Sequence, residues 1–148
     1  MAKFRLAPVL KLRLHREELR KRELAVALAD ENRLKEVVLR LARLRQDQAD
    51  EFRRQQQAGQ LDVRAIIERK TFIGLLERRI REQLVVVARA EQQTQQRRQE
   101  LLAAMKDRKA LDVLHERHNE RVRQAEARQE TMALDEIGGR LGGAGVEA

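Results

Sequence analysis

Two apolar runs lie at equal distances on either side of one glycine, Gly59. The first covers residues 34–44 and the second covers residues 72–88, and in both runs the apolar residues recur at helical spacing. Each run therefore predicts a helix with one apolar face, which needs a partner to cover it. If the chain folds back at Gly59, residues whose numbers sum to about 120 face each other, and each helix covers the other. The sequence thus predicts an all-α fold, in which two long, unequal helices form an antiparallel coiled-coil hairpin.

The first helix and the turn can be placed from local chemistry, within a hairpin expected over residues 1–137. Pro8 suits the first turn of a helix, because the amide hydrogen that it lacks would have no partner there. The first helix is therefore expected over about 8–57. Gly59 is a typical left-handed stop, and the turn is expected over about 58–61.

The second helix is expected over about 62–137. Asp62 is a typical N-cap, and Leu61 and Ile66 have the spacing of a hydrophobic staple. No proline interrupts the pattern that follows. Five glycines and few apolar residues then predict a disordered tail over 138–148.

The two helices differ in length, at about 75 Å and about 110 Å for a rise of 1.5 Å per residue. The second helix should therefore overrun the N-terminus from about His115 to Glu136, with Phe4 facing about residue 116. One end of the hairpin is then a closed turn. The other end carries the N-terminus and a single projecting helix.

Packing is expected to vary along the hairpin. A well-filled seam is predicted near the turn, formed by Leu34, Val38 and Leu41 against Ile73, Leu76, Ile80, Leu84 and Val87. In the middle, Leu24 and Leu28 face a glutamine-rich stretch, residues 92–96, which predicts a weak, solvated layer or a hinge. A strict heptad does not persist across these segments, so we expect an irregular supercoil.

The apolar surface near the turn is wider than a two-helix seam requires. The surplus residues, which we call the turn-side flank, are Val37, Leu44, Phe72, Leu75 and Leu76. Such a surplus predicts a surface for a partner. The alternative is self-association into a four-helix bundle.

The composition excludes several classes of protein. The chain has no cysteine, which rules out disulfides and thiolate metal sites and agrees with a reducing cytosol. Charged residues interrupt the N-terminal segment every few positions, unlike a secretory signal. The longest apolar stretch ends at Arg89, well short of the roughly 18 residues that a membrane span needs. We therefore expect a cytoplasmic protein with no transmembrane segment.

The net charge of +8 raises the question of nucleic-acid binding. Arginine supplies most of this charge, but glutamate alternates with it, as on solvated helix surfaces. The most basic segment, residues 3–22, is interrupted by leucines, and the phenylalanines are too scattered to stack bases. We expect no nucleic-acid partner.

No motif in the sequence predicts catalysis. His115 and His118 share a helix face, but zinc needs at least a third protein ligand, so two surface histidines are the simpler interpretation. The glycines after residue 137 lack the Lys-Ser/Thr of a phosphate-binding loop. A two-helix rod also offers no enclosed pocket. We expect a non-enzymatic protein with no cofactor and no metal.

Three short motifs, spread over nearly the whole chain, form a pattern. They are Phe4-x-Leu6-x-Pro-Val-Leu10 followed by Arg13 and Glu17; Arg108-Lys-Ala-Leu111-Asp-Val-Leu114-x-Glu-Arg117; and Glu130-x-x-x-Leu-Asp-Glu136. With the length, the basic character and the two unequal antiparallel arms, this pattern resembles the FliJ family. FliJ is the small coiled-coil protein of the bacterial flagellar type III export apparatus.

The resemblance implies a stalk that inserts its termini-bearing end into the channel of a hexameric export ATPase and stimulates it. It also implies contacts with the membrane export gate protein and with export chaperones. It places the protein in the cytoplasm, peripherally associated with the inner face of the cell membrane at the flagellar base. The processes implied are flagellum biogenesis, flagellar protein export, motility and chemotaxis.

The resemblance and the hairpin together predict two partner-binding surfaces. The ATPase contact is expected at the open end, from Phe4, Leu6, Leu10, Arg13, Leu14, Leu114, Arg117 and Val122. The gate or chaperone contact is expected on the turn-side flank. The alternatives are a generic coiled-coil adaptor unrelated to export and an injectisome stalk protein, which the neighbouring genes would distinguish.

Overall fold

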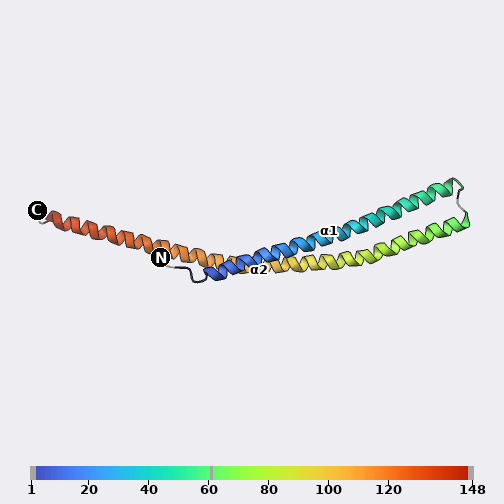
Figure 1. Ribbon diagram of the computed structural model, residues 1–148. Helices are drawn as coiled ribbons and strands as arrows, with labels where there is room; N and C mark the ends of the chain where they lie inside the picture. Colours follow the sequence, from blue (N-terminus) through green and yellow to red (C-terminus); the bar gives the residue numbers. More distant parts are fainter. Residues whose placement is uncertain (1–2, 61, 147–148) are drawn as a thin grey trace. The chain divides into compact units, whose positions relative to one another are not determined.

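The computed structural model describes residues 3–60 and 62–146, and its regular structure is helical. Helix α1 spans Ala7–Gln57 and helix α2 spans Val63–Val146 (Figure 1). The described residues contain no strand. The helices pack against each other in opposite directions, which confirms the predicted all-α hairpin of two unequal helices.

The end of α1 is shaped by a glycine. Gly59 has a φ of 68°, the left-handed conformation that only glycine adopts without strain. The amide of Gln60 donates to the carbonyl oxygen of Gln55 at 3.1 Å, and the amide of Gly59 donates to that of Gln56 at 3.2 Å. These two bonds form a Schellman motif, so Gly59 ends the helix as the sequence predicts.

The start of α2 is fixed by a side-chain cap. The Oδ1 atom of Asp62 accepts a hydrogen bond from the amide of Ala65 at 2.7 Å. The first backbone bond of the helix runs from the amide of Ile66 to the carbonyl oxygen of Asp62 at 3.1 Å. Leu61, the other half of the expected staple with Ile66, lies outside the described residues.

Cross-helix ion pairs agree with the predicted register. Nη1 of Arg13 lies 2.9 Å from Oδ2 of Asp107, and Nη1 of Arg20 lies 3.2 Å from Oε2 of Glu100. The residue numbers of both pairs sum to the value expected for a chain folded back at Gly59.

The contacts of the chain form two compact units, each of which contains part of both helices. Unit 1 consists of residues 1–18 and 103–148, and unit 2 consists of residues 19–102. Two units arise because each turn of a two-helix hairpin contacts only the turns that face it, so contacts stay local along the helices. The single domain expected over 1–137 stays a prediction.

A regular seam holds the helices together in both units. On α2, buried and half-buried residues recur at alternating spacings of three and four, without a break from Ile66 to Val122. On α1 the same spacing holds from Leu10 to Leu41. The expectation of an interrupted heptad was therefore wrong. It failed because the seam includes polar and small residues, which a pattern of large apolar residues does not reveal.

The middle of the seam, in unit 2, is covered rather than solvated. Thr94 is only 3% exposed and Ala27 is also buried, while Gln93 and its glutamine neighbours point to solvent. The expected apolar layer near the turn also differs in detail. Leu76 and Val87 are buried, but Leu84 is 49% exposed and lies beside the seam.

Helix α2 does not end near residue 137. It continues to Val146, where a disordered tail was expected over 138–148. Among the described glycines only Gly59 has a positive φ, so Gly138 does not form a helix stop. An exposed glycine costs a helix only about 1 kcal/mol relative to alanine, which weakens the helix without ending it.

Neither helix, over the residues described, combines the length and the apolar character needed to cross a membrane.

Candidate partner-binding surfaces

An aromatic contact fixes the N-terminal segment to α2 in unit 1. The ring of Phe4 stacks on His115 with centroids 4.8 Å apart and planes 24° apart, and it lies 5.4 Å from the ring of His118. The sequence predicted that Phe4 faces about residue 116. The amide of Ala7 donates to the carbonyl oxygen of Phe4 at 3.1 Å, so this segment leads directly into α1. Both imidazoles thus pack against a phenyl ring.

The residues predicted for the ATPase contact fall into two groups. Leu10 is buried, Arg13 pairs with Asp107 and Phe4 packs on α2, so these three side chains hold unit 1 together. The remaining ones are exposed or half-buried, and they are Leu6, Leu14, Leu114, Arg117 and Val122. The second group is the part of the predicted surface that a partner can reach.

Beyond Val122, α2 continues as a single helix that we call the overrun, residues 123–142, and all of its residues are exposed. The sequence placed its start near His115, but the contacts of Phe4 keep α2 covered for about two further turns. Leu134, Ile137 and Leu141 have the spacing of one helix face. This apolar face was not among the predicted surfaces, although the helical spacing of its residues can be recognised in the sequence.

The seam of unit 1 contains a buried charge. Glu17 is 5% exposed and accepts a hydrogen bond from Nε of Arg108, whose Nη1 also donates to Asp112. The bond to Glu17 raises the pKa of Arg108, and the bond to Asp112 adds to this effect. The guanidinium therefore stays charged and binds the two helices together.

The seam of unit 2 contains a network of four charged side chains. Arg20 donates to Glu23 at 2.9 Å and to Glu100 at 3.2 Å, and Arg97 donates to Glu100 at 3.0 Å and to Glu23 at 3.4 Å. Each carboxylate thus contacts an arginine of both helices. The hydrogen bond to Glu23 raises the pKa of Arg20, and burial opposes this effect. From the sequence, these charges were expected to lie on solvated helix surfaces.

The turn-side flank in unit 2 is exposed except at two positions. Leu44, Phe72 and Leu75 are exposed, Val37 is half-buried, and Leu76 is 4% exposed. The placement of Leu76 on this flank is therefore corrected, because the three-and-four spacing of the seam includes it. Leu75, one residue earlier, is rotated by about 100° around the helix and faces outward.

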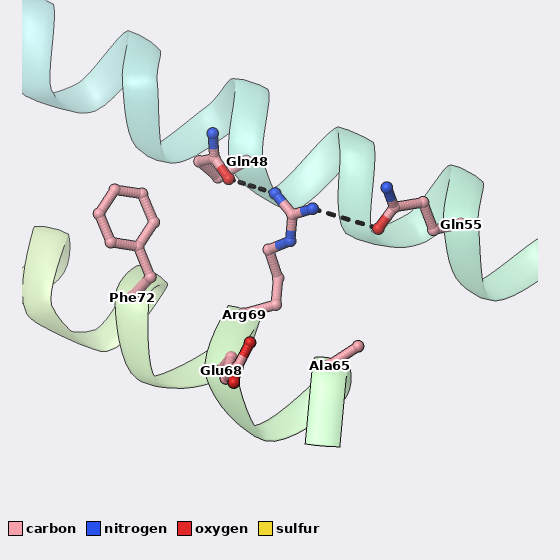
Figure 2. Close-up of a pocket in the computed structure, with 6 residues that line it drawn as sticks. All are labelled: Gln48, Gln55, Ala65, Glu68, Arg69 and Phe72. Carbon is pink, nitrogen blue, oxygen red and sulfur yellow. Dashed lines mark hydrogen bonds between the residues drawn. The ribbon is translucent and has the colours of Figure 1, made fainter. Parts of the chain in front are cut away.

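A polar bridge joins the helices beside this flank. In Figure 2, the Arg69 side chain extends from α2 towards two glutamines of α1. It donates to the Oε1 atoms of Gln48 and, at 3.1 Å, of Gln55. Phe72 lies one turn further along α2 and lines the same open groove of about 270 Å³. The structure thus places an exposed aromatic ring next to a fixed arginine.

A second, more apolar groove lies elsewhere on unit 2. Val38, Leu39, Leu84 and Val87 line it, and Nζ of Lys35 spans its rim to Oε1 of Glu91 at 3.5 Å. This groove was not predicted from the sequence, because Leu84 was expected to lie in the seam.

Among the residues described, no group of three or more histidine, cysteine or carboxylate side chains is arranged to hold a metal ion.

A comparison with protein families adds one match. The family model described as Flagellar FliJ protein matches residues 1–145, which is nearly the whole chain. No curated protein and no solved structure matches the chain.

Proposed function

The chain belongs to the flagellar FliJ family and is therefore a component of the flagellar export apparatus, and we propose that it serves there as a non-enzymatic stalk. Its termini-bearing end inserts into the channel of a hexameric export ATPase and stimulates that enzyme. Its turn-side flank contacts the membrane export gate protein or export chaperones. ATP is hydrolysed by the partner, and the stalk needs no cofactor.

The observation that carries this proposal is the overrun of α2. A helix that enters a narrow channel must be single and must keep contact side chains on its surface. Residues 123–142 meet both conditions, because all are exposed and Leu134, Ile137 and Leu141 share one face. Leu6, Leu14 and Leu114 add exposed apolar side chains in the same unit.

The second contact is supported by the composition of the turn-side flank. Phe72 and Leu75 are large, exposed apolar residues on one helix, and Leu44 is exposed on the other. Two cross-helix hydrogen bonds fix the side chain of Arg69 beside this flank. A rigid apolar patch beside a fixed polar group is suited to protein binding, because little side-chain entropy is lost there.

The proposal also gives the protein a location. A stalk between a soluble ATPase and a membrane gate is cytoplasmic and peripherally associated with the inner face of the cell membrane at the flagellar base. Loss of the protein should then stop flagellum assembly, and motility and chemotaxis would fail as a consequence.

Truncation after Arg123 tests the ATPase contact. It removes the overrun but retains His115, His118 and Val122, so the seam and the Phe4 contact stay intact. We expect the shortened protein to melt at nearly the same temperature, to lose stimulation of the export ATPase and to fail to restore motility to a strain that lacks the gene. Full stimulation by the shortened protein would contradict insertion through this end.

The matched control changes the other surface. Replacing Phe72 and Leu75 by Ser alters two exposed residues of the turn-side flank and leaves Leu76 in the seam. This variant should stimulate the ATPase normally but impair export. If it also loses stimulation, the separation of the two contacts is wrong.

A further inference from the structure

Charged residues occupy seam positions on both helices, where coiled coils usually have apolar residues. On α1 they are Arg13, Glu17, Arg20 and Glu31, and on α2 they are Arg69, Arg97 and Arg108. All of them are buried or half-buried. Charges in such positions cost desolvation energy, and well-packed apolar residues often stabilise a protein as much or more. Stability alone therefore does not account for them.

In the hairpin, six of these seven charges contact a suitable partner on the other helix, whereas Glu31 pairs with Lys35 of its own helix. Glu17 is matched with Arg108 in unit 1, and Arg20 and Arg97 share two carboxylates in unit 2. These contacts join residues from opposite helices and depend on the antiparallel register. They are the contacts that a different pairing of the helices would lose.

A competing pairing is available to this sequence. The seam positions of α2 keep a three-and-four spacing from Ile66 to Val122, which is the spacing at which the helices of a two-stranded coiled coil meet. In a parallel, in-register pair, identical seam residues face each other. Arg69, Arg97 and Arg108 would then each face the same arginine of the second copy. Like charges in such contacts are strongly unfavourable.

We propose that the charged seam residues direct each chain to close on itself as an antiparallel hairpin and prevent two copies from pairing in parallel through α2. The charges thus select among pairings of the helices. The inference stands on the seam contacts and does not depend on the proposed function.

A cysteine at a seam position distinguishes the two pairings, because the chain contains no other cysteine. Thr94 lies in the seam and is almost completely covered in the hairpin. In a parallel pair, Cys side chains introduced by Thr94→Cys in two copies would face each other within disulfide distance. With all native charges in place, we expect no disulfide-linked dimer under mild oxidation.

The decisive variant removes the seam charges of the matched contacts and neutralises the carboxylates that would otherwise lose their arginines. It combines Glu17→Leu, Arg20→Leu, Arg97→Leu and Arg108→Leu with Glu23→Gln, Glu100→Gln, Asp112→Asn and Thr94→Cys, so that none of these carboxylates stays charged without its arginine. We expect the disulfide-linked dimer to increase by about tenfold or more, because two of the three like-charge contacts, those at Arg97 and Arg108, are gone. Circular dichroism and sedimentation establish that the variant is helical and report its oligomeric state.

The matched control exchanges the charges. Glu17→Arg with Arg108→Glu and Asp112→Lys keeps opposite charges together in the hairpin and like charges together in a parallel pair, so with Thr94→Cys it should behave as the parent. A disulfide-linked dimer of the parent or of the exchanged variant would overturn the proposal. So would a Leu variant that forms no such dimer, whether it stays monomeric or associates in another way.

Discussion

Helix α2 has a covered part and an uncovered part. From Ile66 to Val122, every third or fourth residue is buried or half-buried against α1 or the segment before it, whereas in the overrun no residue is covered. Both parts have apolar residues at helical spacing, for example Leu134 and Ile137 in the overrun. Burial along α2 therefore follows the extent of its contacts with α1 and with Phe4. A helix can thus keep an apolar face available for a partner simply by being longer than its neighbour.

The two parts should also differ in local stability. Short isolated helices are marginal in water, and most helical stability in proteins comes from packing. The overrun is helical because it continues a helix that is already formed. Its backbone amides should therefore open and exchange far more readily than those of the covered part.

The largest effect that separates the two parts is expected from leucine truncation. Leu76→Ala removes a buried side chain from the seam and should lower the free energy of unfolding by ~2–4 kcal/mol. Leu134→Ala, the matched change in the overrun, should alter it by less than ~0.5 kcal/mol, since Leu134 is 62% exposed. Urea unfolding followed by circular dichroism measures both. Equal losses would mean that the overrun is covered in solution.

An intermediate effect is expected beside the seam. Leu84 lies in the covered part of α2 but is about half exposed, so Leu84→Ala should cost about 1 kcal/mol. The same unfolding experiment measures it. A loss of stability as large as that of Leu76→Ala would show that Leu84 belongs to the seam, whereas in the structure it lies one residue beside it.

The smallest effects, of opposite sign, are expected at two glycines. Gly59→Ala forces alanine into a left-handed φ and should destabilise the hairpin by up to ~1 kcal/mol. Gly138→Ala, in the uncovered helix with open space around it, should instead raise helicity, by up to ~1 kcal/mol of local helix stability. Thermal melting reports the first change, and hydrogen exchange of the overrun reports the second. A higher melting temperature of Gly59→Ala, or faster hydrogen exchange in the overrun of Gly138→Ala, would contradict these assignments.

Much of the fold could be predicted because it depends on local rules and on symmetry. Gly59 and Asp62 have side-chain and backbone preferences that nearly determine the caps on either side of the turn. Once the turn is placed, the register follows, and it correctly positioned Phe4 near the histidines of α2. The helix lengths then implied an overrun.

The composition of the seam could not be predicted in the same way. The apolar surface of α2 is wide near the turn, so a seam that includes Leu84 and one that passes beside it, through Leu76 and Val87, fit the apolar pattern almost equally well. Polar seam residues such as Thr94 and Glu17 decide between them, but their burial depends on partners in the other helix. The same limit applies to the candidate sites, because Leu75 and Leu76 are equally apolar in sequence and differ only in the direction they face.

The reversal at Gly59 has a consequence for the order in which the chain folds. The sequence separation of facing residues grows with distance from the turn, from 21 residues for Gln48 and Arg69 to 94 for Arg13 and Asp107. Closing a long loop costs more entropy than closing a short one, and every pair formed near the turn shortens the loop left for the next pair. Folding should therefore start at the turn and proceed towards the termini. The contact of Phe4 with α2 forms last and is the first to open.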